Sequence, residues 1–407
     1  MSNKNQHLSP EDAQVIKNQV FSDTLPGTLL KDFQALLDFI GSDGIEVTKT
    51  TQHIGMKYLF ELNERMTRPV ETELKRPQQK AFPNLHGLYL LLRVSGLARL
   101  VKDKNKTLLK LDPDVLASWQ QLNAVERYFS LLFCWIVRGD EEILGESRSW
   151  NNQSFRRCLE VYQSTKPSGS KEHGSRGYMM ALYFVSLHNV ALMALFGFLI
   201  RTKFNPGGSL EGVELSDFGR ALLAYFDTAT ELYMDENDYE LSDGFYDFCA
   251  KDLMPLFPDW QNRLLIKERE VLTEGYSVIA VKVRDAVRKL AVPHDAVLHD
   301  FAMSILDAFN FDDDHLYEFV YKNELGLIER VTERVAHSFA DDGDYWADDM
   351  TLGEMPIHEG MTFVFHYDFG DDWRFECQIE SLIKEAGKYT EPKVIEKKGR
   401  APKQYYY

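Results

Sequence analysis

Two runs of alternating apolar and polar residues, within residues 361–379, meet at a turn that is rich in glycine and aspartate. Such alternation is typical of β-strands, because successive side chains of a strand point to opposite faces. The large apolar side chains of both runs have odd numbers, so odd positions must pair with odd positions if both strands bury the same face. This parity predicts a hairpin whose loop is centred on Asp371, either the three residues 370–372 or five residues, with Phe365 opposite Cys377.

The same register predicts the contacts on the polar face of the hairpin. Asp368 would lie opposite Arg374, and His366 would lie opposite Glu376. Cross-strand pairs of opposite charge stabilise a sheet by roughly 0.2–1 kcal/mol each. We therefore interpret His366 as half of a surface ion pair rather than as a general base or a metal ligand.

The N-terminal part of the chain follows a helical period instead. Its apolar spacing and its turn residues predict, in order, a helix, a short strand, two helices and a hairpin with a lysine-rich tip, at residues 28–40, 45–48, 56–66, 85–97 and 98–111. This is the order of a winged-helix domain. In a DNA-binding winged helix the third helix enters the major groove and the hairpin, or wing, contacts phosphate.

Charge limits where a nucleic acid could bind. The chain has 46 basic and 63 acidic side chains, a net charge of −17, which argues against a grip on polyanions by the whole protein. Residues 1–110 nevertheless carry a basic excess. The predicted third helix is very apolar. The alternative to a DNA-reading role is therefore a helix that packs against the rest of the domain on both sides. The candidate nucleic-acid-binding residues are Lys75, Arg76, Arg93, Lys102, Lys104 and Lys106.

A second helical block and then a mixed region are expected beyond this unit. Aromatic residues on several faces mark a helix at 119–135 as a core element, and the apolar stretch 181–200 is expected to form one buried helix rather than a membrane span. The passage 207–226 is similar to the step from wing to last helix in winged-helix proteins. The rest combines strands with one main helix, at residues 276–284, 295–309 and 316–321.

The predicted fold class is therefore α+β, with a mostly helical N-terminal half followed by an antiparallel or mixed sheet packed with one main helix. Four segments are expected: a flexible leader, a winged-helix-like domain, a second helical block for which a winged-helix-like topology is one alternative, and an α+β domain, at residues 1–25, 26–138, 139–262 and 275–407.

The string Tyr367-Asp-Phe-Gly-Asp-Asp-Trp373, with the upstream segment Phe311-Asp-Asp-Asp-His-Leu-Tyr-Glu-Phe319, resembles the paired signature of the plasmid pRiA4b open-reading-frame-three-like family. The resemblance covers roughly residues 275–407. It implies a prokaryotic protein, in a family sometimes linked to mobile elements and labelled resolvase-like, to which no activity is securely attached. A Trp-Arg-Arg-like segment usual in the family is replaced here by Val287-Arg-Lys-Leu290.

Known catalytic and cofactor patterns are absent from the sequence. There is no Walker-type loop, dinucleotide fingerprint or nucleophile elbow, so no catalytic residue is assigned and no cofactor is expected. The N-terminus lacks a signal peptide and no membrane contact is expected, which favours a cytoplasmic location. The cysteines are far apart in the sequence and are interpreted as reduced, buried thiols: Cys134, Cys158, Cys249 and Cys377.

Aspartates gather before the strand at 316–321 and at the hairpin tip. Hard divalent cations bind several carboxylate oxygens, but aspartate at strand ends also forms turns and caps. We expect no metal site here. If one exists, its ligands would be Asp313, Asp314, Asp368, Asp371 and Asp372.

The sequence favours a binding or regulatory protein rather than an enzyme, with an unidentified protein or nucleic-acid partner. One hypothesis is the nucleic-acid contact above. A second is a protein-interaction module, in which rigid aromatics beside carboxylates bind a basic peptide. A third is a metal-dependent phosphodiesterase or recombination-related activity at the aspartates. The candidate partner-binding residues are Tyr317, Phe369, Asp371, Asp372 and Trp373.

Overall fold

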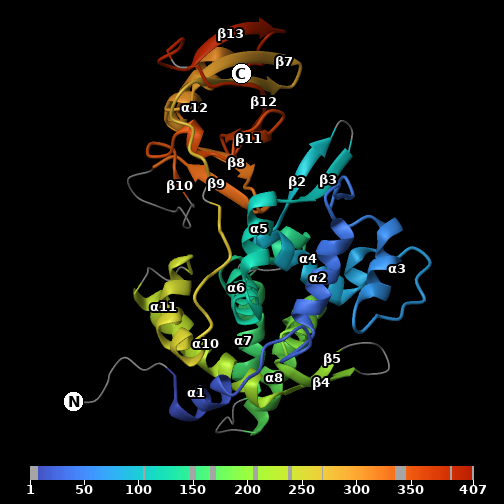
Figure 1. Ribbon diagram of the computed structural model, residues 1–407. Helices are drawn as coiled ribbons and strands as arrows, with labels where there is room; N and C mark the ends of the chain where they lie inside the picture. The colour runs from blue at the N-terminus through green and yellow to red at the C-terminus, as the bar shows by residue number, and fades with distance from the viewer. Residues whose placement is uncertain are drawn as a thin grey trace. The chain divides into compact units, whose positions relative to one another are not determined.

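The computed structural model of the chain describes residues 8–103, 106–146, 153–165, 171–204, 210–236, 241–267, 269–334, 345–385 and 387–405. The chain divides into two compact units, Met1–Lys267 and Glu268–Tyr407. The first unit is mostly helical, and the second is a sheet with one long helix (Figure 1). The α+β fold class is therefore confirmed.

The helical unit begins with a small sheet framed by helices. Its first elements are α1 (Pro10–Lys17), α2 (Leu29–Ile40), β1 (Ile45–Glu46), α3 (Met56–Arg65), η1 (Gln79–Ala81), α4 (Pro83–Val94), β2 (Ala98–Asp103), β3 (Lys106–Leu111), α5 (Pro113–Gln121) and α6 (Ala124–Arg138). The three strands pair in the order β1–β3–β2, all antiparallel. The predicted order of helix, strand, two helices and hairpin is present in the structure.

A second set of helices and a second hairpin complete this unit. They are η2 (Glu141–Leu144), α7 (Ser154–Thr165), α8 (Lys171–Phe184), α9 (Leu187–Leu195), β4 (Leu199–Phe204), β5 (Leu210–Leu215), α10 (Asp217–Glu236), α11 (Gly244–Leu253) and η3 (Met254–Leu256). In both sets a short buried helix, α4 or α9, leads directly into a two-stranded hairpin.

Helix α4 is buried on every side. Every residue from Leu85 to Val94 is buried, because α4 packs against α6 and α9. The contact with α9 is so close that a Cβ atom on Gly87 would lie 2.7 Å from the Leu192 side chain and 3.1 Å from the His188 carbonyl oxygen. Only glycine fits this position without displacing α9.

The first residues of the described chain are packed rather than loose. Ser9 caps α1 by accepting the Asp12 N–H, and Ile16 is fully buried. The Phe21 ring lies 4.8 Å from the Tyr128 ring and 5.3 Å from the Phe257 ring, centroid to centroid. The expectation of a flexible leader therefore does not hold for residues 9–25, because their aromatic and aliphatic side chains enter the core of the unit.

The apolar stretch 181–200 is not one helix, as expected, but the end of α8, all of α9 and the start of β4. The chain bends by 93° between Arg176–Phe184 and Leu187–Leu195. Gly197, with φ of 77°, then allows the turn into β4. Within the described residues no single helix is long and apolar enough to cross a membrane, whereas this bent pair passes the same test of length and composition.

The C-terminal unit is an eight-stranded mixed sheet. Its elements are β6 (Tyr276–Val283), β7 (Ala286–Pro293), α12 (Leu298–Phe309), β8 (Tyr317–Lys322), β9 (Ile328–Thr332), β10 (Tyr345–Trp346), η4 (Leu352–Glu354), β11 (Thr362–Tyr367), β12 (Trp373–Ile383) and β13 (Lys393–Lys398). Among the described strands the order is β10–β9–β8–β11–β12–β6–β7–β13, and only the β10–β9 pair of these is parallel.

Helix α12 packs on one face of this sheet through aromatic side chains. Phe301 stacks on Phe319, with ring centroids 5.6 Å apart, and Phe309 meets Phe375 edge-on at 5.3 Å. The odd-numbered apolar residues of β11 and of β12 up to Ile379 belong to this core. The alternation in the sequence thus marks the face that α12 covers.

The hairpin confirms the predicted parity but corrects the register. Phe363 pairs with Cys377, Phe365 with Phe375 and Tyr367 with Trp373. Phe365 and Cys377 are both buried, as predicted, yet they do not lie opposite each other. The register differs from the prediction by two residues, so that the loop comprises residues 368–372.

The side chain of Asp368 explains this loop. Its Oδ1 accepts the N–H groups of Gly370 and Asp371, and its carbonyl oxygen accepts the Asp372 N–H at 2.7 Å. Asp368 and Asp372 both have positive φ, 51° and 52°, which aspartate tolerates better than most residues. A side-chain-capped loop of this kind cannot be recognised from alternation alone.

The predicted polar pairs change with the register. His366 lies opposite Arg374, not Glu376, and Asp368 lies in the loop. His366 is also buried rather than on the surface, with its Nδ1 3.1 Å from Glu318 and its Nε2 2.9 Å from Asp372. The surface-pair interpretation of His366 is therefore wrong, because its partners come from β8 and the loop.

We expect Gly87→Ala to lower the free energy of unfolding by about 1–3 kcal/mol, because the added methyl group overpacks the α4–α9 contact. Thermal or denaturant unfolding of the full chain measures this. Gly177→Ala, in an open position of α8 with no atom within 4 Å of the added Cβ, is the matched control and should be neutral or stabilising. In the Leu192→Ala background, Gly87→Ala should cause a smaller loss of stability, because the side chain that the new methyl group would meet has been shortened. Equal losses of stability at Gly87 and Gly177 would contradict the described contact.

Candidate functional site

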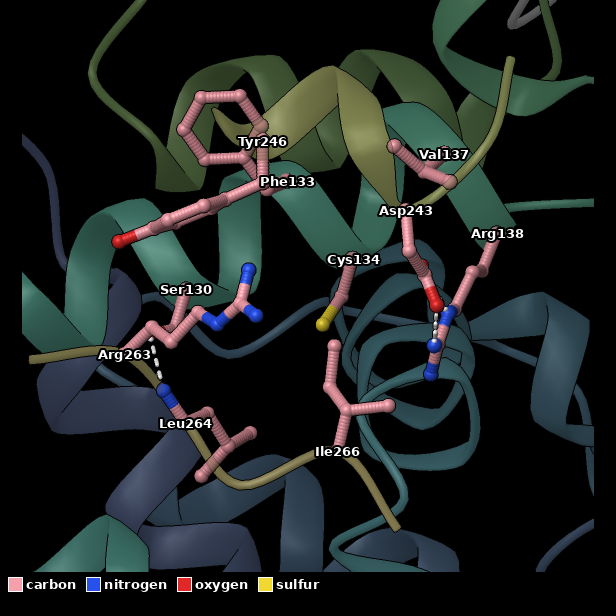
Figure 2. A pocket seen from close by; sticks show the side chains of 10 residues that line it. All are labelled: Ser130, Phe133, Cys134, Val137, Arg138, Asp243, Tyr246, Arg263, Leu264 and Ile266. Atoms are coloured by element: carbon pink, nitrogen blue, oxygen red, sulfur yellow. Dashed lines mark hydrogen bonds and ion pairs between the residues drawn. The ribbon is translucent and has the colours of Figure 1, made fainter. Parts of the chain in front are cut away.

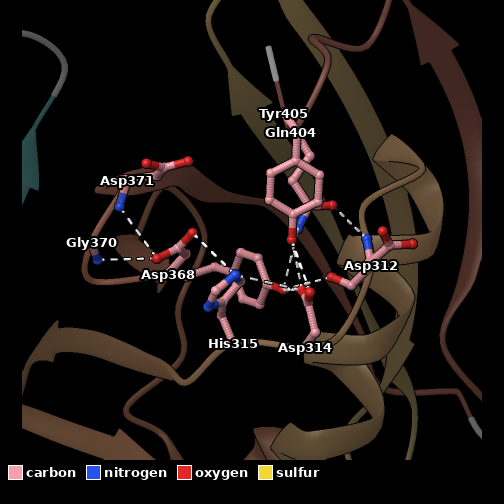
Figure 3. Close-up of polar contacts among 9 residues, drawn as sticks. Asp312, Asp314, His315, Asp368, Gly370, Asp371, Gln404 and Tyr405 are labelled. Atoms are coloured by element: carbon pink, nitrogen blue, oxygen red, sulfur yellow. Dashed lines mark hydrogen bonds and ion pairs between the residues drawn. The ribbon is translucent and has the colours of Figure 1, made fainter. Parts of the chain in front are cut away.

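The aspartates before β8 are tied to the hairpin tip and to the C-terminal residues of the described chain (Figure 3). The Tyr405 hydroxyl donates to Asp314 at 2.8 Å, and the Tyr367 hydroxyl donates to the Asp312 carbonyl oxygen at 2.6 Å. Gln404 is buried and accepts the Asp312 N–H at 2.6 Å. The hydrogen bond from Tyr405 holds the pKa of the Asp314 carboxyl below its usual value.

The five aspartates named as alternative metal ligands do not converge on one point. Asp368 caps its own loop, Asp372 lies 2.8 Å from Arg374 and 2.9 Å from His366, and Asp314 accepts from tyrosine hydroxyls. Asp313 and Asp371 are exposed. Within the described residues, this tip brings no three ligand atoms within 4.8 Å of one another. Turn formation and hydrogen bonding account for these carboxylates.

The aromatic residues of the candidate partner-binding set are divided between core and surface. Tyr317 and Trp373 are buried beneath α12 and the tip, so they cannot line an open groove. Phe369 is 50% exposed, and its ring lies 4.9 Å from the His366 ring. Asp371 and Asp372 lie beside it in the exposed loop. The expected aromatic face of the sheet is therefore the buried face.

The opposite face of the sheet carries a different surface. Val320 of β8 lies beside Val364 of β11, and the row continues through Glu376 of β12 to Lys282 of β6. Together with neighbouring positions this row lines an open hollow of about 740 Å³. Its floor is aliphatic and its rim is charged: Ala280, Val287, Val320, Ile328 and Val364, with Lys282, Lys322 and Glu376. The aromatic core and this hollow occupy opposite faces of the same strands.

The candidate nucleic-acid-binding residues differ in their exposure to solvent. Lys75, Arg76, Lys102 and Lys106 are exposed, and Lys106 lies 3.4 Å from Glu46. Lys104 lies outside the described residues. Arg93 is buried, and its guanidinium donates to the Tyr89 hydroxyl at 3.1 Å, so the predicted contribution of Arg93 to a surface contact is not available in this structure.

A small hollow in the helical unit lies between α6, α11 and the segment before residue 267 (Figure 2). Arg138 and Asp243 form an ion pair at its edge, and Arg263 lies over the Tyr246 ring at 4.9 Å. Burial raises the pKa of the Cys134 thiol to about 11, which keeps it protonated and unreactive. The space, about 30 Å³, has room for roughly one water molecule. It is too small for an organic substrate.

One polar cluster was not predicted from the sequence. His86 of α4, His188 of α9 and Glu146 after η2 lie together in the helical unit. Burial lowers the pKa of His86, and lowers that of neighbouring His53 to about 4. Burial alone would raise the pKa of Glu146, but His188 and His86 lower it further than burial raises it. The signal in the sequence that could have pointed to this cluster was a histidine within each of two apolar segments.

Comparison with known proteins found a family match for the C-terminal unit. Residues 279–404 match the family described as plasmid pRiA4b ORF-3-like protein, which confirms the resemblance of this domain. A crystal structure of the protein of unknown function MM3350 from Methanosarcina mazei Go1 is similar, with 19% identity over 31% of this chain and 70% of that chain and a TM-score of 0.27. No curated protein was found to match the chain.

We expect Asp314→Asn to lower the melting temperature of the protein near pH 7, whereas Asp313→Asn, its exposed neighbour, should not. The carboxylate of Asp314 accepts hydrogen bonds from two tyrosines, which lowers its folded-state pKa, so its stabilising effect is present above the unfolded-state pKa of about 3.9 and is lost as the pH falls. Melting curves of both variants from pH 3 to 7 test this. A difference that persists unchanged at pH 3 would contradict the assignment.

Proposed function

We propose that the protein is a non-enzymatic binding protein and that its C-terminal domain recognises a protein partner through the open face of the sheet. The observation that carries this proposal is the hollow on the face opposite α12, lined by Val320, Ile328 and Val364. Partly exposed aliphatic side chains on the floor and charges on the rim are the arrangement of protein recognition surfaces.

The rigidity of the surface supports this proposal. Strands β8 and β11 are fixed from behind by the aromatic core, since Phe319 and Phe365 are fully buried on their other face. A surface on a packed sheet loses little conformational entropy when a partner binds, which favours affinity. The rim contains the Lys282–Glu376 ion pair, at 3.5 Å, which is exposed and able to exchange partners.

A photo-crosslinking experiment tests the surface directly. A benzoylphenylalanine residue at Thr362, which is exposed in the hollow, is expected to capture a discrete protein in extracts of the source organism. Ile328→Glu should abolish this crosslink, because it places a charge among the aliphatic residues that line the hollow. Ile395→Glu is the matched control, since Ile395 is 44% exposed on edge strand β13 and Ile328 is 39% exposed.

The outcome separates recognition from general stickiness. A crosslink that survives Ile328→Glu, or that Ile395→Glu removes equally, would contradict the proposed surface. Circular dichroism of each variant confirms that the sheet is folded. Failure to capture any protein from Thr362 in the folded chain would also count against the proposal.

The wing of the helical unit supports a second candidate function, contact with nucleic acid. In support of this candidate, the element order α2–β1–α3–α4–β2–β3 is the order that the sequence analysis associated with a winged helix, and Lys102 and Lys106 are exposed on the β2–β3 hairpin. Because α4 is buried, this contact would involve the wing and phosphate groups rather than the base edges of a groove.

If the wing binds duplex, changing Lys102, Lys104 and Lys106 to alanine should weaken binding for any base sequence. The slope of the salt dependence should fall by about 0.9 for each phosphate group that the altered wing no longer binds. Fluorescence anisotropy at several salt concentrations measures both effects, with Lys31→Ala on α2 as a control outside the wing. Absent or salt-independent binding by the unchanged protein would rule out this candidate.

A further inference from the structure

Two histidines and a glutamate meet where α4 packs against α9. His86 Nε2 lies 3.4 Å from Glu146 Oε1, and His188 Nδ1 lies 3.5 Å from Glu146 Oε2. The candidate ligand atoms of the three residues are all within 4.8 Å of one another. This is the one group of three such residues that the described parts of the chain bring so close.

Among the described residues, the two imidazoles each have a nitrogen atom without a hydrogen-bond partner. His86 is 1% exposed and His188 is 2% exposed, and the Nε2 atom of each is buried without such a partner. A buried polar atom without a partner costs stability, and such atoms are rare in native proteins. His86 Nε2 faces Glu146, which also lies beside His188 Nδ1, so a cation held there would give this nitrogen a partner.

We propose that His86 Nε2, Glu146 and His188 Nδ1 bind a zinc ion. Two histidines and a glutamate form one of the known three-ligand zinc sets. With zinc–ligand distances of about 2.0–2.1 Å, neighbouring ligand atoms of a tetrahedral site are roughly 3.4 Å apart. The 3.4 Å separation of His86 Nε2 from Glu146 Oε1 agrees with this geometry, whereas His188 Nδ1 lies 3.5 Å from the other carboxylate oxygen, Oε2, so a small rotation of the Glu146 carboxylate would accompany binding. A fourth ligand, water, would enter beside Glu146, whose side chain is 15% exposed.

The surroundings of His188 fit metal binding. When Nδ1 holds the ion, Nε2 carries the ring proton and faces Glu141 Oε1 at 3.8 Å. Glu141 is fixed in turn, because it accepts a hydrogen bond from Asn189 at 2.8 Å, and Asn189 accepts one from Ser154. A carboxylate that accepts a hydrogen bond from a metal-binding histidine orients the ring and raises its basicity. Glu141 would take this role if the ring moved closer on binding, because the present 3.8 Å separation is too long for a hydrogen bond.

The hydrogen bonds around His86 are expected to limit the affinity of the site for zinc. The Gln79 amide nitrogen lies 2.8 Å from His86 Nδ1, while Gln79 Oε1 accepts the Ile54 N–H at 2.7 Å. Zinc on Nε2 places the ring proton on Nδ1, which then needs an acceptor. The Gln79 amide must therefore shift its hydrogen bonds when the ion binds. A carboxylate at position 79 would accept from both Ile54 and His86, so Gln79→Glu should tighten binding roughly tenfold or more.

This site would join the two halves of the helical unit, since α4 and α9 each supply a histidine and the loop after η2 supplies the glutamate. It differs from the aspartate tip in ligand type and in place. It is also independent of the proposed recognition surface, which belongs to the C-terminal unit.

Zinc titration of the full-length, chelator-treated protein tests the proposal. We expect one zinc ion per chain by calorimetry and metal analysis, a rise in melting temperature with zinc, and a cobalt complex with the strong visible absorption of tetrahedral coordination. Glu146→Gln, an isosteric change at the least buried ligand, should abolish the cobalt spectrum while the chain stays folded, and His188→Asn should do the same.

His53→Asn is the matched control. The His53 ring lies 5.2 Å from that of His86, but its Nε2 contacts the Leu144 carbonyl oxygen at 3.0 Å and is outside the ligand set, so zinc binding should persist. Tighter binding by Gln79→Glu would support the assignment of His86 Nε2. No zinc uptake by the folded protein, or uptake unchanged by Glu146→Gln, would overturn the proposal.

Discussion

The close contact of α4 with α9 is the constraint on which the helical unit depends. The two helices approach so near that position 87 accepts no side chain without displacement of Leu192. Because α6 packs on α4 as well, the helix that would read DNA in a winged-helix protein has no exposed residue from Leu85 to Val94. The same contact brings His86 and His188 together and buries both. One packing contact thus determines both the burial of the third helix and the position of the polar cluster.

The C-terminal unit depends on a different asymmetry, between the two faces of one sheet. The face toward α12 contains the aromatic side chains, which bury large areas and make edge-on contacts such as that of Phe309 with Phe375. The other face has the Val320–Val364 pair and charged neighbours around a hollow. The aromatic residues therefore stabilise the sheet from one face, and the aliphatic and charged residues lie on the other. The aspartates at the tip serve the loop and the ordering of residues 404–405.

Much of the fold could be predicted from the sequence, because buried faces of strands and helices place apolar residues at regular intervals in the sequence. The odd-numbered apolar residues of the hairpin identified its buried face, and the apolar character of residues 85–97 was consistent with a helix packed on both sides. The register could not be predicted, since it depends on two hydrogen bonds that the Asp368 side chain accepts from the N–H groups of Gly370 and Asp371. Phe21 was missed because its partners, such as Phe257, are distant in sequence.

The candidate sites were harder to predict, because tertiary contacts between distant parts of the chain determine which side chains meet. His86, Glu146 and His188 come from three separate segments, and only the tertiary contact of α4 with α9 brings them together. Arg93 belongs to a basic region by sequence, but the helical period turns it toward Tyr89 and the core. The candidate partner-binding residues Tyr317 and Trp373 are aromatic residues at strand ends, and composition alone cannot assign them to the covered or the open face of the sheet.

Hydrogen exchange of the backbone amides of α4 shows whether this helix is a core element or a DNA-reading helix. For a core element, we expect the amides from Leu88 to Val94 to exchange among the slowest in the helical unit, at rates that added duplex DNA leaves unchanged. Rapid exchange of α4 in the free protein, or protection that α4 gains only when DNA is added, would show that α4 is not a fixed part of the core.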